Sequence, residues 1–227
     1  SRNCPRGSIF FALKGDKFDG NQYAEKALAS GCVYAVIDNP DYFIGERTIL
    51  VDNVLTTLQQ LAHRHRKVIG CPIIGITGTN GKTTTTSLLG EIMKNYAQSS
   101  FVVGNIGNPY TSIALQTRED SVIVAEMSSF QLETIQTFRP RVSAILNITP
   151  DHLNRHHTME AYIEAKENIA KNQTEKDTCV LNYEDDVTRA FGENVKSKVL
   201  YFSSQRILEE GIYPVSYTHL RAHETRR

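Results

Sequence analysis

A glycine-rich segment near the middle of the chain has the residues needed to bind phosphate groups. Residues 78–83 read Gly-Thr-Asn-Gly-Lys-Thr, follow the mostly apolar run 72–77 and precede a helical stretch at about 84–96. Glycines let backbone N–H groups turn toward phosphate oxygens, and the start of a helix adds partial positive charge. In such a loop Lys82 would reach the β- and γ-phosphates of a nucleotide, and the Thr83 hydroxyl would bind Mg²⁺.

This loop is shorter than the usual phosphate-binding pattern G-x-x-x-x-G-K-[ST]. Ile76 stands where that pattern has its first glycine, so the loop must begin at Gly78, and a plain glycine turn is the alternative. A phosphate loop alone does not separate GTPases, kinases, motor ATPases and ligases. A GTPase also needs a guanine-reading N-K-x-D motif, and the sequence contains none. The expected nucleotide contacts are Gly78, Thr79, Asn80, Gly81, Lys82, Thr83 and Thr84.

Two further polar clusters follow predicted strands and could complete a metal site. Glu126 ends the apolar run 122–125, and Asp151 with His152 comes after the run 144–148. Because ligands bind outside the carboxyl ends of parallel strands, we expect these clusters at the same edge as the phosphate loop. Glu126 could then face the Mg²⁺ of the nucleotide. Taken singly, Glu126 is equally consistent with a solvated strand end, and His152 with a helix-capping or surface histidine.

The residues around Lys166 do not mark it as functional. Lys166 lies on a helix predicted over about 158–171, whose apolar residues form no clean stripe. Its neighbours Glu164 and Glu167 are charged, so the pattern favours a surface lysine. The pair at 156–157, His-His, is interpreted in the same way, as a polar turn before the helix.

The elements that must hold these residues alternate between strands and helices. Such alternation is typical of an α/β protein with a parallel sheet, here a phosphate-loop domain preceded by a smaller α/β region. Asn21 and Asn53 are expected to cap the first two helices. The predicted strands are residues 8–13, 32–37, 48–51, 72–77, 101–103, 121–125, 142–148, 178–181 and 198–202.

The composition excludes several classes of protein. The 227 residues hold 25 Lys or Arg and 25 Asp or Glu, so no net charge favours nucleic acid or an anionic membrane. No apolar run approaches the roughly 18 residues of a membrane span, and no secretion signal opens the sequence. Cys4, Cys32, Cys71 and Cys179 are too scattered for a zinc site or a disulfide framework. We therefore expect a cytoplasmic monomer without nucleic-acid or membrane partners.

Several motifs together resemble the Mur ligases, ATP-dependent enzymes that build the stem peptide of peptidoglycan on a UDP-sugar. The resemblance lies in the loop 77–83, the block 147–152 (Asn-Ile-Thr-Pro-Asp-His) and the segment 162–166 (Tyr-Ile-Glu-Ala-Lys). Within the family, residues 126–133 (Glu-Met-Ser-Ser-Phe-Gln-Leu-Glu) and 104–107 (Gly-Asn-Ile-Gly) resemble the branch that adds D-glutamate.

The resemblance implies a role for each matching residue. Lys82 and Thr83 would hold the ATP phosphates and a first Mg²⁺. Glu126 and His152 would bind a second Mg²⁺, and Lys166 would match the family's carbamylated lysine, whose added carboxylate orients that metal. Carbamylation needs a neutral amine, so a lysine pKa lowered by burial would favour it. The residues that would line the UDP-muramoyl substrate are Asn105, Ser128 and Ser129.

The implied reaction joins UDP-N-acetylmuramoyl-L-alanine to D-glutamate through an amide bond. The muramoyl-alanine carboxylate attacks the γ-phosphate of ATP to give an acyl phosphate, and the amine of the amino-acid acceptor then displaces phosphate. Positioning and cations that stabilise the spread negative charge would supply most of the catalysis. The alternatives are a D-alanyl-D-alanine-adding Mur ligase, a nucleotide-binding module without ligase activity, and a composite whose motifs survive without catalysis.

The two parts of the chain resemble different branches of the family. Residues 71–215 are expected to form a truncated central ATP-binding domain. Residues 1–70 resemble instead the UDP-binding domain of the branches that add D-alanyl-D-alanine or a diamino acid, chiefly through 7–15 (Gly-Ser-Ile-Phe-Phe-Ala-Leu-Lys-Gly). Because the resemblances meet at about 75–85, a chimera is favoured over one natural ligase with a divergent first domain.

The end of the sequence departs from the pattern of the rest. Residues 216–227 show no apolar period, which favours a non-native tail over a natural basic one. The third domain of the family, which binds the incoming amino acid, has no counterpart. We therefore expect a fragment that is inactive alone.

Overall fold

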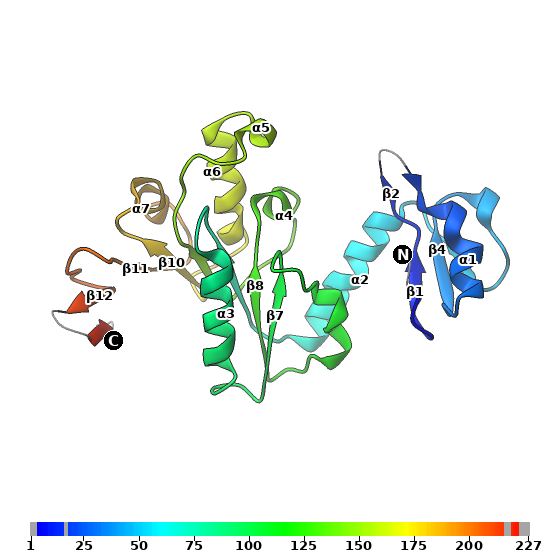
Figure 1. Ribbon diagram of the computed structural model, residues 1–227, viewed down its shortest axis with the longest axis horizontal. Helices are drawn as coiled ribbons and strands as arrows, with labels where there is room; N and C mark the ends of the chain where they lie inside the picture. Colours follow the sequence, from blue (N-terminus) through cyan, green and yellow to red (C-terminus); the bar gives the residue numbers. More distant parts are fainter. Residues whose placement is uncertain (1–3, 16–17, 216–218, 223–227) are drawn as a thin grey trace. The chain divides into compact units, whose positions relative to one another are not determined.

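The computed structural model describes residues 4–15, 18–215 and 219–222, and it divides into two units (Figure 1). The division falls after Val68, with residues 1–68 in the first unit and 69–227 in the second. Each unit contains a parallel sheet with helices, so the predicted α/β class is confirmed. No helix in the described part of the chain is long and apolar enough to cross a membrane.

The first unit is built on a three-stranded parallel sheet in the order β1-β4-β5. A buried cluster that includes Ala12, Ala35 and Ile37 forms its core. Its strands are β1 (Ile9–Phe11), β4 (Tyr34–Ile37) and β5 (Thr48–Leu50), with the antiparallel pair β2 (Lys14–Gly15) and β3 (Phe18–Asp19). Its helices are η1 (Gly20–Tyr23), α1 (Ala24–Ala29), η2 (Pro40–Tyr42) and α2 (Val54–Ile69), the last ending at the division.

The two predicted asparagine caps have different outcomes. Asn53 accepts a hydrogen bond from the Thr56 amide at 2.8 Å, as a capping residue of α2 does. The prediction for Asn21 is wrong, because Asp19 caps η1 by accepting from the Asn21 amide. The Asn21 side chain is fully buried, and its amide group bonds to Asp38, the residue that follows β4.

The second unit is built on one eight-stranded sheet in the order β13-β12-β11-β10-β9-β6-β8-β7. All neighbours are parallel except β12 and β13. The strand before the phosphate loop, β6, lies between β8 and β9, so the carboxyl ends of these three strands adjoin. The strands are β6 (Ile73–Thr77), β7 (Ser99–Gly104), β8 (Ser121–Glu126), β9 (Val142–Ile145), β10 (Thr178–Asn182), β11 (Lys198–Phe202), β12 (Ile212–Val215) and β13 (His219–Ala222).

Helices α4, α5 and α6 gather beyond the carboxyl ends of these strands, and α3 runs beside the sheet (Figure 1). The backbone of β13 pairs with β12, and it is the only described part of the predicted tail; residues 216–218 and 223–227 lie outside the described residues. The helices of this unit are α3 (Lys82–Met93), η3 (Tyr110–Ser112), η4 (Ala114–Gln116), α4 (Ser129–Glu133), α5 (Leu153–His156), α6 (Met159–Glu167), η5 (Asn168–Ala170) and α7 (Asp186–Gly192).

The strand predicted over 142–148 ends early, at Ile145. From Leu146 onward the backbone leaves the sheet and follows the phosphate loop instead. The Leu146 amide donates to the Thr77 carbonyl at 3.0 Å, and the Thr79 amide donates to the Asn147 carbonyl at 2.9 Å. Leu146 is therefore apolar because it packs beside the loop glycines, and Ile148 because it joins a buried cluster with Leu132 and Tyr162.

Candidate active site

The phosphate loop joins β6 to α3 and has the backbone conformation that glycine allows. Gly78 and Gly81 have φ angles of +147° and +80°. Gly81 is the N-terminal cap of α3, and a Cβ at Gly78 would lie 3.1 Å from the Leu146 Cβ. Both glycines are therefore required by conformation, and Gly78 also by a close approach. As at the start of any helix, the first amides of α3 have no partner within the helix.

The predicted nucleotide contacts lie together at the start of α3. Thr83 and Thr84 are exposed in its first turn, and Lys82 is half-buried. The Lys82 Nζ donates a hydrogen bond to the Thr79 carbonyl at 2.8 Å, across the loop. The lysine therefore already lies over the loop that would hold phosphates.

The segment after β9 holds the loop in place from the side. The Asn80 amide donates to Asn147 Oδ1 at 2.8 Å, and Asn147 Nδ2 donates back to the Asn80 carbonyl at 3.2 Å. The Thr149 amide donates to Thr79 Oγ1 at 3.0 Å. These bonds join residues about seventy positions apart, so the resembling motifs at 77–83 and 147–152 form one structure.

Lys166 is buried next to the loop, so its interpretation as a surface lysine is wrong. Its side chain is only 2% exposed, and its Nζ donates to the Gly78 carbonyl at 2.7 Å. The Nζ also lies 4.7 Å from the centre of the Tyr162 ring. Burial, with a contribution from the nearby Lys82 charge, lowers the pKa of Lys166 from 10.5 to about 8.

Glu126 is also buried, so its interpretation as a solvated strand end is wrong. Its side chain is 1% exposed, and Oε1 accepts a hydrogen bond from Asn105 Nδ2 at 2.9 Å. The other oxygen, Oε2, is buried and has no hydrogen-bond partner within the described residues. A Cβ at Gly104 would lie 2.1 Å from the Glu126 carbonyl oxygen, so only glycine lets β7 end so close to Glu126.

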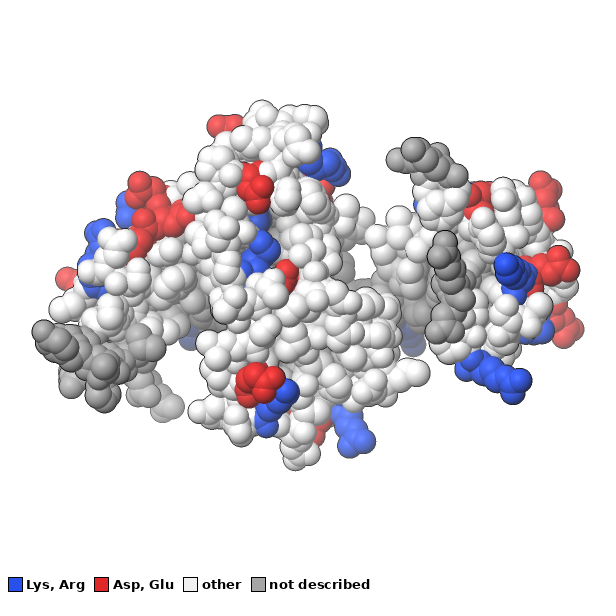
Figure 2. Space-filling model, viewed as in Figure 1, with Lys and Arg blue, Asp and Glu red and all other residues white. Residues whose placement is uncertain are grey.

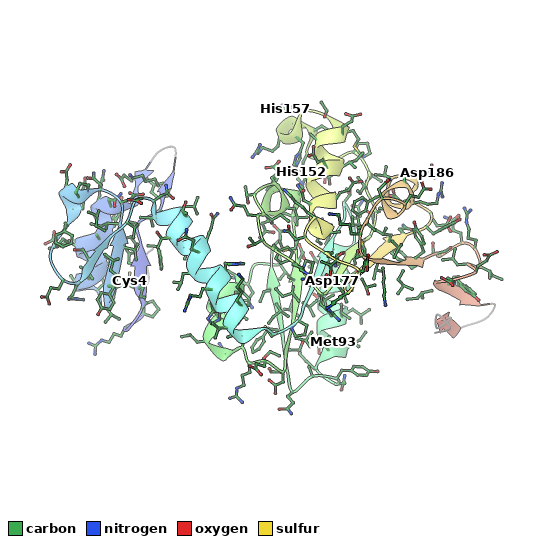
Figure 3. All side chains as sticks on the ribbon, turned by 180° about the vertical axis from the view of Figure 1, so that it is seen from behind. Cys4, Met93, His152, His157, Asp177 and Asp186 are labelled. Carbon is green, nitrogen blue, oxygen red and sulfur yellow. The ribbon has the colours of Figure 1, made fainter. Side chains whose placement is uncertain are left out.

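His152 lies at the same end of the sheet but is exposed (Figure 3). Its φ of +52° turns the chain into α5, and its amide donates to Asp151 Oδ1 at 2.8 Å. His152 Nε2 is 3.5 Å from Asp151 Oδ2. Among the described residues no three His, Cys, Asp or Glu side chains form a group that could hold a metal ion. The metal set of Thr83, Glu126, His152 and Lys166 therefore stays a prediction.

The predicted substrate residues lie at the end of β7 and the start of α4. Asn105 is exposed beside Glu126. Ser128 caps α4 in a capping box with Gln131, and Ser129 is buried with its Oγ 2.9 Å from His156 Nε2. Sequence reasoning missed His156, which it placed in a polar turn. No periodicity marks this residue, because its burial depends on α4, which precedes it by more than twenty positions.

Charged side chains of both signs lie on the surface of the second unit near this edge of the sheet. Figure 2 shows Lys or Arg atoms and Asp or Glu atoms close together between α3 and α6. A phosphate loop, a buried carboxylate with a free oxygen and a buried lysine of lowered pKa together form a site suited to a nucleotide and a cation.

The sequence matches two family models along most of its length. Residues 76–213 match the Mur ligase middle domain. Residues 1–66 match the model described as the Mur ligase family, catalytic domain. The first match alone covers more than half of the chain, and it contains the phosphate loop, Glu126, His152 and Lys166.

Curated relatives and solved structures agree with these matches. The chain is 69% identical over 141 residues to UDP-N-acetylmuramoylalanine--D-glutamate ligase of Lachnoclostridium phytofermentans. The aligned segment covers 62% of this chain and 31% of that protein. It is 59% identical over 140 residues to the enzyme of the same name from Clostridioides difficile. The chain thus spans about a third of the length of these relatives.

Among solved structures, MurF from Acinetobacter baumannii is 26% identical, has a TM-score of 0.75, and aligns over 93% of this chain and 48% of that one. MurF ligase from Thermotoga maritima, solved in complex with ADP, is 24% identical with a TM-score of 0.74 and shares the fold over 90% of this chain and 49% of that one. The mixed resemblance seen in the sequence is therefore confirmed, and the chain belongs to the Mur ligase family.

Proposed function

We propose that the chain carries the nucleotide site of a ligase that adds D-glutamate to UDP-N-acetylmuramoyl-L-alanine at the expense of ATP. The observation that carries the proposal is the meeting of the phosphate loop, the unpartnered Glu126 oxygen and the buried Lys166 at one edge of the sheet. The identity of 69% to a D-glutamate ligase supports the choice of acceptor.

In this proposal the loop from Gly78 to Thr84 binds the phosphates of ATP. Lys82 exchanges its bond to the Thr79 carbonyl for bonds to phosphate oxygens, which become more negative as the γ-phosphoryl group is transferred. The muramoyl-alanine carboxylate attacks the γ-phosphorus, so an acyl phosphate forms and ADP leaves. The amine of D-glutamate then attacks the acyl carbon, and phosphate leaves as the amide forms.

The residues present fit Mg²⁺. Carboxylate and hydroxyl oxygens are ligands that Mg²⁺ accepts, and Glu126 Oε2 is a buried carboxylate oxygen with no protein partner within the described residues. Thr83 would hold the first Mg²⁺, and Glu126 and His152 would hold the second, with Lys166 once carbamylated. Bound Mg²⁺ supplies positive charge against the phosphates. A pKa of about 8 leaves a usable neutral fraction of Lys166 for attack on carbon dioxide, which forms the carbamate and releases a proton.

The two neighbouring polar residues with access to solvent, Asn105 and Ser128, would line the muramoyl substrate. In the first unit, a cavity of about 880 Å³ has aromatic walls that include Phe10, Phe11 and Tyr23. We propose that the predicted first domain, residues 1–70, which contains this cavity, binds the uridine part of the substrate. We also propose that the protein acts as a monomer in the cytoplasm.

A graft tests this function directly. The 141-residue segment of this chain that matches the Lachnoclostridium phytofermentans relative replaces the corresponding segment of that enzyme. The hybrid is expected to release phosphate only when ATP, UDP-N-acetylmuramoyl-L-alanine and D-glutamate are all present, and Lys82→Ala should abolish the release. A folded hybrid that binds ATP but releases no phosphate would favour a nucleotide-binding module without ligase activity. The chain by itself is expected to show no turnover.

A D-alanyl-D-alanine-adding ligase is the second candidate, favoured by the structural match over 93% of the chain to UDP-N-acetylmuramoylalanyl-D-glutamyl-2,6-diaminopimelate--D-alanyl-D-alanyl ligase from Acinetobacter baumannii. Titration of the chain with UDP-N-acetylmuramoyl-L-alanine and with the UDP-muramoyl tripeptide separates the two. Tighter binding of the tripeptide would favour the second candidate. The proposed chimera of residues 1–70 with 71–215, and the proposed non-native tail at 216–227, are tested by continuous long DNA reads across the codons for residues 70–90 and 210–227.

A further inference from the structure

A buried histidine links the two ends of α4 to the segment that carries His152. His156 Nδ1 lies 2.9 Å from Glu133 Oε1, and His156 Nε2 lies 2.9 Å from Ser129 Oγ. The side chains of His156 and Ser129 are each about 2% exposed. Glu133 is also held by Arg155 Nη2 at 3.2 Å. The imidazole therefore bonds to the first and last residues of α4.

The ring of His156 also packs between two aromatic side chains. It stacks on Phe130 with ring centres 5.4 Å apart and an angle of 11°, and its centre is 5.2 Å from that of Tyr162. Tyr162 extends the contact to the phosphate loop, because its hydroxyl lies 3.2 Å from Thr79 Oγ1. Phe130 extends it to His152, with ring centres 5.2 Å apart.

The position of α4 must come from such contacts. A helix of five residues has almost no stability of its own, because the first turn fixes several backbone angles for one hydrogen bond. The carboxylate of Glu133 accepts a hydrogen bond from Nδ1–H, which leaves the Nε2 lone pair to accept the Ser129 hydroxyl hydrogen. We assign this tautomer from the hydrogen-bond network.

We propose that His156 is a positioning residue that holds α4 through Ser129, so that Ser128 faces the muramoyl substrate. Ser129 is then an anchor rather than a residue that touches the substrate, as its burial requires. This inference rests on the proposed function, because it assigns His156 to the substrate side of that site. The nucleotide side is not expected to depend on His156, since the phosphate loop is also held by Asn147 and Thr149.

Two conservative variants separate the two bonds of the histidine. The amide of His156→Gln reaches the position of Nε2 and keeps the bond to Ser129, whereas that of His156→Asn reaches the position of Nδ1 and keeps only the bond to Glu133. We expect the Kd for UDP-N-acetylmuramoyl-L-alanine to rise about tenfold in His156→Ala and His156→Asn, the loss of about one well-formed bond. His156→Gln should stay within about threefold of the wild type.

The Kd for ADP in the same chain is the internal reference and should not change in any variant. His157→Gln, which alters the exposed neighbouring histidine, is the matched control. The double variant Ser129→Ala with His156→Ala should bind the muramoyl substrate no more weakly than either single variant, because both remove the same link.

Equal losses in the Gln and Asn variants, or additive losses in the double variant, would overturn the inference while leaving the proposed function intact. Failure of the wild-type chain to bind UDP-N-acetylmuramoyl-L-alanine overturns both. If substitutions of His156 prevent folding, Ser129→Ala tests the same link between His156 and Ser129, because this variant leaves the imidazole in place. An unchanged Kd in Ser129→Ala overturns the inference, and a rise of about tenfold that Ser129→Thr reverses supports it.

Discussion

The two units each place a carboxylate at the carboxyl end of a parallel strand, Asp38 half-buried and Glu126 buried, but with opposite surroundings. In the first unit, Asp38 follows β4 and accepts hydrogen bonds from Lys14 at 2.9 Å, Asn21 at 3.0 Å and the Val54 amide at 3.2 Å. In the second unit, Glu126 ends β8, accepts from one side chain and has a second oxygen without a partner within the described residues.

The lysines of the two units differ in the direction of their pKa shifts. Burial would raise the pKa of Asp38, but the bonds from Lys14, Asn21 and Val54 outweigh it and lower that pKa. Asp38 in turn raises the pKa of Lys14. Burial instead lowers the pKa of Lys166 to about 8. A network whose polar groups are all satisfied stabilises a fold, whereas one with unsatisfied buried groups is suited to a ligand that completes it.

The largest expected effect is the loss of the closed network in Asp38→Ala. The variant removes one of the two acceptors of the buried Asn21 amide group, the side-chain acceptor of the Val54 N–H and the ion-pair partner of Lys14, so the unfolding free energy of the first unit should fall by about 3 kcal/mol. Hydrogen exchange at the Val36 amide in β4 measures this stability. The control is Asp41→Ala, which removes an exposed aspartate of η2. A fall no larger than that of the control would contradict the structural role.

Lys166→Met should have the next largest effect and the opposite sign. A buried lysine whose pKa falls from 10.5 to about 8 lowers the unfolding free energy by about 3 kcal/mol below pH 8. Between about pH 8 and 10.5 the unfolded state keeps a proton that the folded state has lost, so wild-type stability rises with pH. Urea denaturation across this range should show the rise in the wild type and in Lys171→Met, but not in Lys166→Met. Parallel curves for all three proteins would refute the lowered pKa.

Glu126→Gln should affect binding more than stability. The neutral amide cannot balance a cation, so the increase in ADP affinity on adding Mg²⁺ should shrink about tenfold. The unfolding free energy should be unchanged or higher, because a buried charge with an unpaired oxygen is removed. Isothermal titration with and without Mg²⁺ measures the first effect. Glu164→Gln, an exposed glutamate of α6, is the control, and an equal Mg²⁺ effect in both variants would exclude Glu126 as a ligand.

Tyr162→Phe should have the smallest effect. It removes the hydroxyl that lies 3.2 Å from Thr79 Oγ1 and keeps the ring that contacts Lys166 and His156. We expect the unfolding free energy to fall by about 1 kcal/mol, since one partly buried hydrogen bond is lost. Thermal denaturation measures the difference from a control variant, Tyr96→Phe, in which the substituted tyrosine is 82% exposed. A loss well above that value would show that the hydroxyl has further partners.

Much of the second unit could be predicted from residue patterns. Apolar runs located β6 to β11 but not β12 or β13, and the loop glycines at 78 and 81 have the positive φ angles that their place in the pattern requires. The three polar clusters follow β6, β8 and β9, which the sheet places side by side. These features can be read locally, because they depend on the alternation of strands and helices, on glycine conformations and on the rule that the carboxyl ends of parallel strands lie at one edge of the sheet.

Burial could not be predicted at the positions that matter most. Helix α6 lies against α4 and α5, and Lys166 is buried because its amine reaches the phosphate loop, although no apolar stripe in the sequence marks it. Asn21 was expected at a helix start, but the Asn21 side chain is buried in the first unit, where it donates a hydrogen bond to Asp38. His156 was assigned to a turn, although α4 encloses it.

The sequence by itself determined the phosphate loop, the order of the polar clusters and the family motifs, because each lies within a few consecutive residues. Only the tertiary structure decided which charged groups are deprived of water and which are paired. The amine of Lys166 meets the carbonyl of Gly78 across 88 positions of chain, and its pKa falls because that packing removes water from the ammonium group. Desolvation depends on neighbours brought together by folding, and no local pattern records them.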